Sequence, residues 1–210
     1  ILMKEFIHGR VLSREFYKQL VAPILSTKCK NLQYTACLLG YGSDVLGYDD
    51  VISTDHMWGP RLYIFITEKN LIHKEYIIDI LAKQLPHKFM GYDVNFSKPD
   101  ASDNGIRHME ESSDEVIAPL IFIDTIENYL KNYLGTSNLS NLTDRDWLSF
   151  SEHKLLSLTK ADIYEDNLGL SEILSPLSFY PNTVKKYLLA SNWSLIAEEQ
   201  AFVKRNMCIK

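Results

Sequence analysis

The sequence predicts an α+β protein: a small mixed sheet with flanking helices, followed by a mostly helical region. In the first part, short segments rich in β-branched and aromatic residues alternate with helical patterns, and Gly, Pro or Asp bounds each segment. After Gly135 the apolar residues recur mostly at helical spacing. A strand-rich part before a helical part is typical of α+β folds. We therefore expect an α/β unit over residues 1–135 and a helical region over residues 136–210.

The composition is that of a globular protein with a buried core. The chain has 210 residues, 46% of them hydrophobic, and its 22 basic and 27 acidic residues give a formal net charge of −5. A negative chain without a local basic cluster makes nucleic acid an improbable ligand. No apolar stretch reaches the roughly 20 residues of a membrane span, and a signal peptide pattern is absent. Three cysteines at unrelated spacings favour reduced thiols, so we expect a cytoplasmic protein.

The elements of the first part follow from the spacing of apolar residues. A helix is expected over residues 13–25, capped by Ser13 and bent or stopped by Pro23. A second helix is expected over residues 71–85, where Pro86 ends an apolar stripe. Strands are expected where short runs are apolar or alternate in polarity, at residues 34–39, 62–66, 91–97 and 116–123.

The later elements are mostly helices with recognisable start signals. Residues 98–114, rich in Asp, Ser and Asn, are expected to form a loop. A helix is expected to follow Thr125 and to close at Gly135. Further helices are expected to begin near Thr143, Ser151, Leu170 and Pro181, with an extended link over residues 161–166. The last helix is the longest, to about residue 205, and its wide apolar face predicts a homodimer or packing against further helices.

Residues 34–67 organise the chain, because two expected strands flank a polar loop there. Gly42 tolerates positive φ and allows a close approach of the backbone to a triphosphate, and Ser43 and free N–H groups can bind phosphate oxygens. Asp55, twelve residues after Ser43, enters the second strand, where a carboxylate can hold Mg²⁺ against those phosphates. This order of features is the layout of nucleotidyltransferases of the polymerase-beta type.

The second carboxylate of such a site is not in its usual place. Two acids at alternate positions usually project from one strand face toward two metal ions, but the partner position of Asp55 is Met57. A thioether is a poor ligand for Mg²⁺. Either Asp44, Asp49, Asp50 or a more distant acid supplies the second carboxylate, or the site binds without catalysing.

His56, Trp58 and Arg61 each have a binding and a structural interpretation. His56 either donates to a phosphate or fixes a tight turn, and Trp58 either packs on the core or stacks on a base. Arg61 either neutralises phosphate or pairs with Asp50 or Asp55. In the binding interpretation, the nucleotide contacts come from Gly42, Ser43, Asp44, His56 and Arg61, and Asp55 is the metal ligand and a catalytic residue.

A third carboxylate usually acts as the general base that deprotonates the attacking hydroxyl. Asp93, Asn95 and Asp124 are the candidates. Asn95 stands where this acid is expected, and an amide cannot accept the proton. Asp124 is the candidate catalytic base, and it also fits as a helix cap.

The chain resembles a bacterial family of uncharacterised proteins, known as a domain of unknown function and described as nucleotidyltransferase-like. The resemblance covers nearly the whole chain and includes Trp58-Gly59-Pro60-Arg61. Its other matching segments are residues 42–49, 53–56, 91–96, 142–143, 146–148, 180–181 and 187–190. The resemblance implies a nucleotidyltransferase α/β unit with a helical region, and family members that continue with further helices.

Two functions from different classes fit these residues. In the first, the protein binds a nucleoside triphosphate with Mg²⁺ and transfers a nucleotidyl group to the hydroxyl of a small molecule or protein, by in-line displacement at the α-phosphorus. In the second, it is a catalytically inactive relative that acts as a nucleotide- or protein-binding module. Met57 and Asn95 favour the second function, whereas Gly42, Ser43 and Asp55 favour the first. The nucleotide, the acceptor and the oligomeric state do not follow from the sequence.

Overall fold

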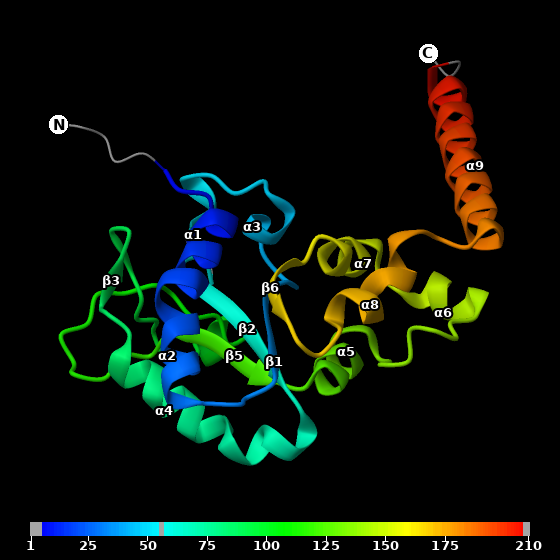
Figure 1. Cartoon of the computed structure of the whole chain (residues 1–210). Helices are drawn as coiled ribbons and strands as arrows, with labels where there is room; N and C mark the ends of the chain where they lie inside the picture. Colours follow the sequence, from blue (N-terminus) through cyan, green and yellow to red (C-terminus); the bar gives the residue numbers. More distant parts are fainter. Residues whose placement is uncertain (1–5, 55–56, 208–210) are drawn as a thin grey trace.

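The computed structural model describes residues 6–54 and 57–207, and a four-stranded mixed sheet lies at its centre (Figure 1). The strands are β1 (Tyr34–Leu38), β2 (Arg61–Ile66), β5 (Leu120–Asp124) and β6 (Asp162–Asp166), in the order β5-β2-β1-β6. β1 is antiparallel to β2 and to β6, whereas β2 and β5 are parallel. The prediction of an α+β fold with a small mixed sheet is confirmed.

One face of the sheet is covered by helices from the first part of the chain. α1 (Gly9–Phe16), a π-helical turn (Tyr17–Val21) and α2 (Ala22–Lys28) follow one another, and α4 (Lys74–Gln84) lies beside α2. The first helix is therefore longer than predicted, and Pro23 does not end it. Proline lacks the N–H that a regular helical turn needs. Here it is the second residue of α2, close behind the π-helical turn, where the hydrogen-bond pattern changes.

The other face of the sheet is covered by helices from the later part of the chain. Side chains alternate between the two faces of a strand, which places Cys37 and Phe65 on this face and Ala36 and Ile64 on the other. The helices that form this second core with Cys37 and Phe65 are α5 (Ile126–Leu134), α6 (Asp144–Ser149), α7 (Glu152–Thr159) and α8 (Leu170–Leu174). Helices on both faces explain why most residues of β1 and β2 are buried on both sides of the strand.

β6 lies beyond the boundary that we placed at residue 135, and it completes the sheet next to β1. The segment predicted as an extended link over residues 161–166 is thus a sheet strand. The second core also combines residues from before and after that boundary, including Phe65 and Leu158. In the structure the helical region is packed on the sheet and contributes to it.

Two predicted strands are shorter than expected. Of residues 91–97, only β4 (Tyr92–Asp93) is a strand, in a hairpin with β3 (Lys88–Phe89). β5 begins at Leu120, after Pro119, which cannot donate a ladder hydrogen bond. Between them the Oδ1 atom of Asn95 accepts a hydrogen bond from the N–H of Ala118 at 2.8 Å, and the N–H of Phe96 donates to the carbonyl of Ala118 at 3.0 Å. One side-chain and one backbone hydrogen bond therefore join these segments. Short 3-10 turns occupy Ile52–Thr54, Glu68–His73, Ala101–Asp103 and Ser175–Ser178.

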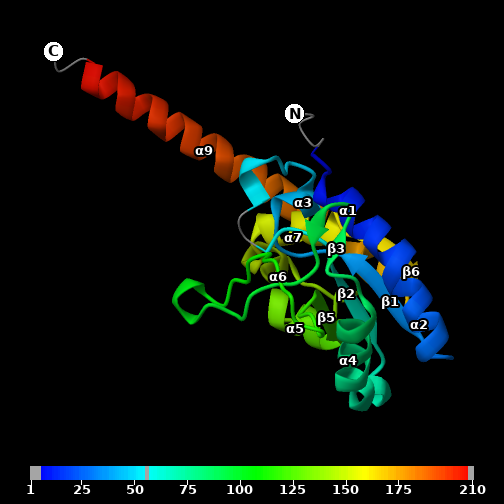
Figure 2. The ribbon, with the colours of Figure 1, turned by 90° about the vertical axis from the view of Figure 1, so that its left-hand side faces the viewer.

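α9 (Asn182–Met207) is the longest helix, and it stands away from the rest of the molecule in both views (Figures 1 and 2). Its first turn packs near α6, with Val184 buried. Farther along, its described side chains up to Ala201 are mostly exposed. No helix within the described residues is long and apolar enough to cross a membrane.

Candidate functional site

The predicted phosphate turn follows β1 and leads into the short helix α3 (Ser43–Leu46). Gly42 has φ 121°, a conformation that glycine adopts far more readily than other residues. A Cβ atom at this position would overlap the carboxylate of Asp44 and lie 2.5 Å from the Nη2 atom of Arg61. The space that the glycine leaves is therefore taken up by these two side chains of the protein itself.

Asp44 and Arg61 form a buried ion pair behind the turn. The Nε atom of Arg61 donates to Oδ2 of Asp44 at 3.0 Å, and Nη2 donates to Oδ1 at 2.7 Å and to the carbonyl of Tyr41 at 2.6 Å. The side chain of Arg61 is only 4% exposed and that of Asp44 only 2%. Burial alone would lower the pKa of Arg61, but the nearby carboxylate of Asp44 outweighs it and raises that pKa. This two-point geometry is the strong form of an arginine–carboxylate contact.

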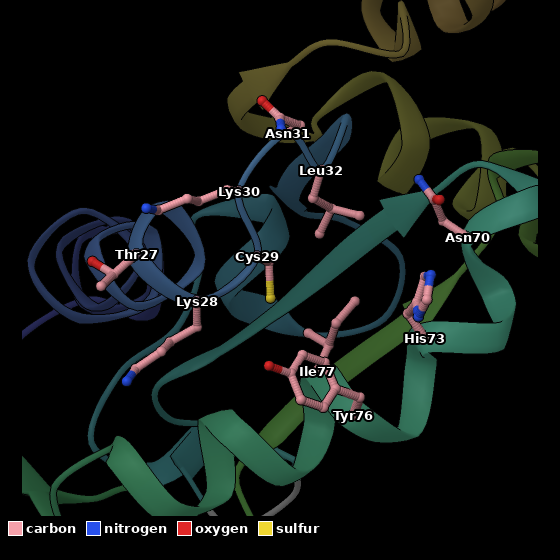
Figure 3. Close-up of a pocket in the computed structure, with 10 residues that line it drawn as sticks. All are labelled: Thr27, Lys28, Cys29, Lys30, Asn31, Leu32, Asn70, His73, Tyr76 and Ile77. Carbon is pink, nitrogen blue, oxygen red and sulfur yellow. The ribbon is translucent and has the colours of Figure 1, made fainter.

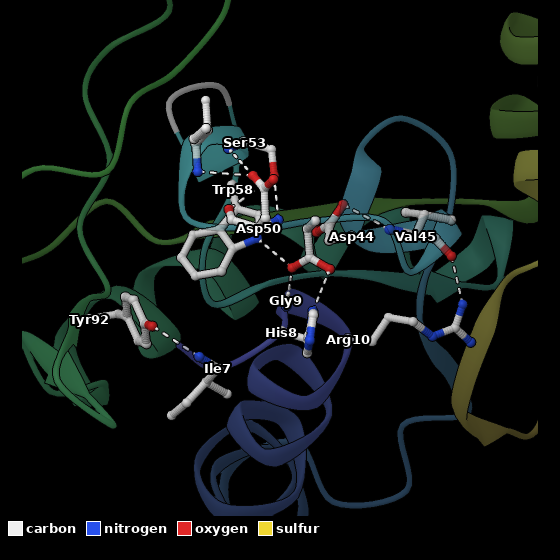
Figure 4. A network of polar contacts seen from close by, with 12 residues as sticks. Ile7, His8, Gly9, Arg10, Asp44, Val45, Asp50, Ser53, Trp58 and Tyr92 are labelled. Carbon is white, nitrogen blue, oxygen red and sulfur yellow. Dashed lines mark hydrogen bonds and ion pairs between the residues drawn. The ribbon is translucent and has the colours of Figure 1, made fainter. Parts of the chain in front are cut away.

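Asp49 is the centre of a second buried network, which joins the loop to the start of α1. Figure 4 shows its partners His8, Gly9 and Trp58 close together. The Oδ2 atom of Asp49 accepts hydrogen bonds from the N–H of Gly9 at 2.6 Å and from Nε1 of Trp58 at 2.9 Å, and Oδ1 lies 3.1 Å from Nδ1 of His8. Burial alone would raise the pKa of Asp49, but these hydrogen bonds together lower it. A Cβ atom at Gly9 would lie 2.9 Å from Nε1 of Trp58, so this close approach requires glycine.

The remaining acid of this loop, Asp50, fixes the turn that leads toward Asp55. Its Oδ1 atom accepts hydrogen bonds from the N–H groups of Ile52 and Ser53 at 2.9 and 3.0 Å. Asp55 and His56, predicted as metal ligand and nucleotide contact, lie outside the described residues. All three acids considered as replacements for the missing second carboxylate, Asp44, Asp49 and Asp50, therefore accept hydrogen bonds within the protein.

Met57 and Trp58 connect the loop to β2 and to the segment around residue 107. Met57 has φ 46°, and its N–H donates to the carbonyl of Arg107 at 3.2 Å. Trp58 is buried, with its ring stacked on Phe6 at 5.5 Å and edge-on to Tyr92 at 5.1 Å. Of the two interpretations of Trp58, the structure shows packing in the core.

Asp124, the predicted general base, lies at the other end of the sheet from the Gly42 turn. In the parallel pair of β2 and β5, Arg61 is opposite Leu120 and Asp124 is opposite Phe65. Four residues of strand separate these positions, which corresponds to about 13 Å. The Oδ1 atom of Asp124 accepts hydrogen bonds from the N–H of Thr125 and the side chain of Asn128 at the start of α5. The structure thus brings Gly42, Asp44 and Arg61 together and leaves Asp124 apart from them.

Mg²⁺ needs several oxygen ligands that are free to bind it. The carboxylates of Asp44 and Asp49 are already engaged, and the predicted ligand Asp55 lies outside the described residues. Asp44 is paired with Arg61, and Asp49 accepts from three donors. Among the residues that the structure describes, no group of three or more His, Cys, Asp or Glu side chains could hold a metal ion.

The sequence did not indicate the two contacts that organise this loop. For Arg61 the sequence left two interpretations open, phosphate binding or pairing with Asp50 or Asp55, and in the structure its partner is Asp44. The role of Asp49 was missed because its partners Gly9 and Trp58 are 40 and 9 residues away and no periodic pattern connects them. A buried acid beside a glycine-rich turn is the type of residue for which a long-range partner should be sought.

Comparison with known proteins gives a match in the last part of the chain. A family model described as a domain of unknown function (DUF4037) matches residues 147–210. This segment starts within α6 and includes β6 and α9. No curated protein and no solved structure matches the chain.

Proposed function

We propose that this chain is a nucleotidyltransferase-like protein that transfers no nucleotidyl group and acts as a protein-binding module, whose partner is a second copy of the chain bound through α9. The observation that carries the proposal is an apolar stripe on α9 with opposite charges before and after it. The second of the two functions expected from the sequence is therefore the one that the geometry favours.

The arrangement around Gly42 supports the absence of transferase activity. The carboxylate and guanidinium that would serve a nucleotide are paired with each other and buried. Separating Asp44 from Arg61 to admit a phosphate would leave a buried charge without its partner, which typically costs about 3–5 kcal/mol. The candidate general base Asp124 is engaged at the opposite end of β2.

The stripe on α9 consists of Leu189, Trp193 and Ile196. These residues follow one another at intervals of four and three, so they lie on one side of the helix. They are 51%, 68% and 49% exposed. Contiguous apolar side chains on a projecting helix mark a surface for another protein.

The charges on α9 indicate which partner fits. Lys185 and Lys186 precede the stripe, and Glu198 and Glu199 follow it. When two copies of one helix pack antiparallel, the start of each lies beside the end of the other. The segment with the two lysines of one helix then lies near the segment with the two glutamates of the other, at both ends of the apolar stripe. Glu199 lies nearer the stripe side than Glu198, and Lys204 and Arg205 come later in the same helix. A parallel arrangement would place like charges side by side.

The position of α9 leaves room for this pairing. The helix extends away from the sheet and its covering helices (Figures 1 and 2). Its 26 residues correspond to about 39 Å of helix. Because only a few large apolar side chains form the contact, we expect a dissociation constant in the range of about 1–100 μM.

Light scattering after size-exclusion chromatography over a concentration series tests the dimer. The native chain should approach the dimer mass at about 100 μM, and Trp193→Glu should remain a monomer with an unchanged melting temperature. Ile72→Glu is the matched control, because Ile72 is an exposed apolar residue away from α9, and it should dimerise like the native chain. A native chain that stays monomeric up to 1 mM would contradict the proposal.

A charge exchange tests the antiparallel direction. The double variant Lys185→Glu/Lys186→Glu should weaken the dimer about tenfold or more, because glutamates then face glutamates. Adding Glu198→Lys and Glu199→Lys to the same chain should restore it. If the double variant dimerises as well as the native chain, the charges do not direct the pairing.

Thermal melting with each nucleoside triphosphate and Mg²⁺ tests the absence of transferase function. We expect no stabilisation of the native chain. If one nucleotide raises the melting temperature only with the metal, and Asp55→Ala abolishes the rise, the nucleotidyltransferase function is the correct one. At about 100 times the dissociation constant, such binding would stabilise the fold by about 2.7 kcal/mol, which is readily measured.

A further inference from the structure

A hollow of about 420 Å³ lies at the end of the sheet opposite to the Gly42 turn (Figure 3). It is bounded by the end of α2, the loop after it, the turn after β2 and the start of α4. Tyr34, the first residue of β1, pairs with Ile66, the last of β2. The residues that line the hollow come just before Tyr34 and shortly after Ile66 in the sequence. The Gly42 turn follows the opposite end of β1.

The rim of the hollow is positively charged in a chain whose net charge is −5. Lys28, Lys30 and His73 line it, and none of its described lining residues is acidic. Neither lysine forms an ion pair with any residue in the described part of the chain. A ligand with a negative group could therefore pair with these lysines without breaking an existing contact.

The amide side chains of Asn31 and Asn70 add hydrogen-bond donors to the same rim. Figure 3 shows Lys28 and Lys30 on the α2 side, with Asn70 and His73 on the α4 side. Several donors around one opening suit a group with several acceptor oxygens, and a phosphate offers them together with a charge of about −2.

The inner wall of the hollow is apolar. Ile77 is buried, Leu32 and Cys29 are half-buried, and Tyr76 is exposed beside them. An apolar floor next to an aromatic side chain suits a flat ring, which can stack on Tyr76 and cover Ile77. The polar rim and the apolar floor lie within one hollow, so a single small molecule can reach both.

We propose that this hollow binds a small aromatic phosphate, with its phosphate at the lysines and its ring between Tyr76 and Ile77. The site is separate from the Gly42 loop and from α9, so its failure and the failure of the proposed function are distinguishable. The shared chemistry, a ring bearing a phosphate, occurs in aryl phosphates and in nucleoside monophosphates.

Alkylation of Cys29 by iodoacetamide tests the site, because Cys29 lines the hollow and Cys37 is fully buried. Cys208 lies outside the described residues and is replaced by serine in every protein compared. The probe is phenyl phosphate. At ten times its dissociation constant it should slow the alkylation of Cys29 about tenfold. Adenosine monophosphate, used in a second series, shows whether a nucleotide is also accepted.

Variants and simpler probes separate the two parts of the site. Lys28→Glu/Lys30→Glu should abolish protection with an unchanged melting temperature. Lys18→Glu/Lys131→Glu, an equal change of charge at exposed positions outside the hollow, should retain it. Inorganic phosphate should protect more weakly than phenyl phosphate, and phenol should not protect.

Three results would overturn the proposal. The first is no protection by phenyl phosphate up to 10 mM, a concentration above the dissociation constants usual for specific sites. The second is equal protection in the Lys28→Glu/Lys30→Glu variant, which would show that the lysines do not bind the probe. The third is equal protection by inorganic phosphate, which would show that the ring is not recognised.

Discussion

Arg61 occupies the first position of β2, where its guanidinium is closed off from water and held by Asp44 and the carbonyl of Tyr41. The charge of a buried guanidinium is stabilised only by its protein partners, because water cannot reach it to replace them. The same ion pair at the surface would contribute little to the free energy of unfolding. The loop around Gly42 is therefore held in place by electrostatics as well as by packing.

The first prediction concerns this pair. Arg61→Met should lower the free energy of unfolding by about 3–5 kcal/mol, because it leaves the carboxylate of Asp44 buried and unpaired. Arg14→Met is the matched control. Arg14 pairs with Asp162 but is 42% exposed, so its loss should cost about 1 kcal/mol or less. Urea unfolding followed by circular dichroism measures both values, and equal costs would contradict the role assigned to Arg61.

The second prediction concerns pH. The hydrogen bonds to Asp49 hold its pKa below the ordinary value of about 3.9 despite burial. A carboxyl group with a lowered pKa in the folded state stabilises the fold above its unfolded pKa, and this contribution is lost as the pH falls through the folded pKa. Asp49→Asn should therefore be less stable than the native chain at pH 7, and the difference should shrink below about pH 4.

Unfolding free energies measured at a series of pH values between about 7 and 2.5 test this dependence on Asp49. Asp79→Asn is the control, because Asp79 is half exposed on α4 and pairs with Lys83 four residues away. That variant should differ little from the native chain at any pH. A stability difference for Asp49→Asn that is constant with pH would show that the carboxylate charge is not what stabilises the network.

For helices and strands, the local sequence was sufficient to predict an element where capping or terminating residues mark its ends. α5 begins after the cap Thr125 and ends at Gly135, as expected, and α6 has the capping box of Thr143 and Asp146. β6 was less visible because its residues are mostly half-buried and its pairing partner β1 is distant in the sequence. An edge strand of this kind has no periodicity that distinguishes it from a link.

The candidate site was less predictable than the elements, for a related reason. The turn at Gly42 could be located because glycine punctuates the sequence after an apolar strand. The side-chain contacts that hold the turn could not be predicted, because Asp44 and Arg61 are 17 residues apart and Asp49 and Gly9 are 40 residues apart. Such contacts depend on which segments the sheet brings together. They can be predicted only when the order of the strands in the sheet is known.

For the whole molecule, the main fact is that the sheet needs both parts of the chain. β6 covers one edge of β1, and the helices after residue 135 cover, together with α5, the face that carries Cys37 and Phe65. Each part would expose apolar surface without the other. α9 differs from the other helices, because beyond its first turns it contributes little to either core.

The third prediction follows from this arrangement. Residues 1–135 expressed alone should not melt cooperatively, because the open edge of β1 and the uncovered face would remain in water. Residues 1–190, which retain Val184 and Leu188 of α9, should melt as a folded monomer. Circular dichroism melting and light scattering measure these outcomes. Cooperative melting of residues 1–135 would show that the first part is an independent domain.

The pairing of β1 with β6 also has a consequence for how the chain acquires its fold. Thr35 and Asp166, which share a hydrogen bond across this pair, are 131 positions apart. During synthesis at about 5–20 residues per second, several seconds pass between the emergence of β1 and that of its neighbour. Contacts of such high sequence separation form slowly. Throughout that interval β1 can pair with β2 on one edge, but its other edge stays open and available to pair with another chain.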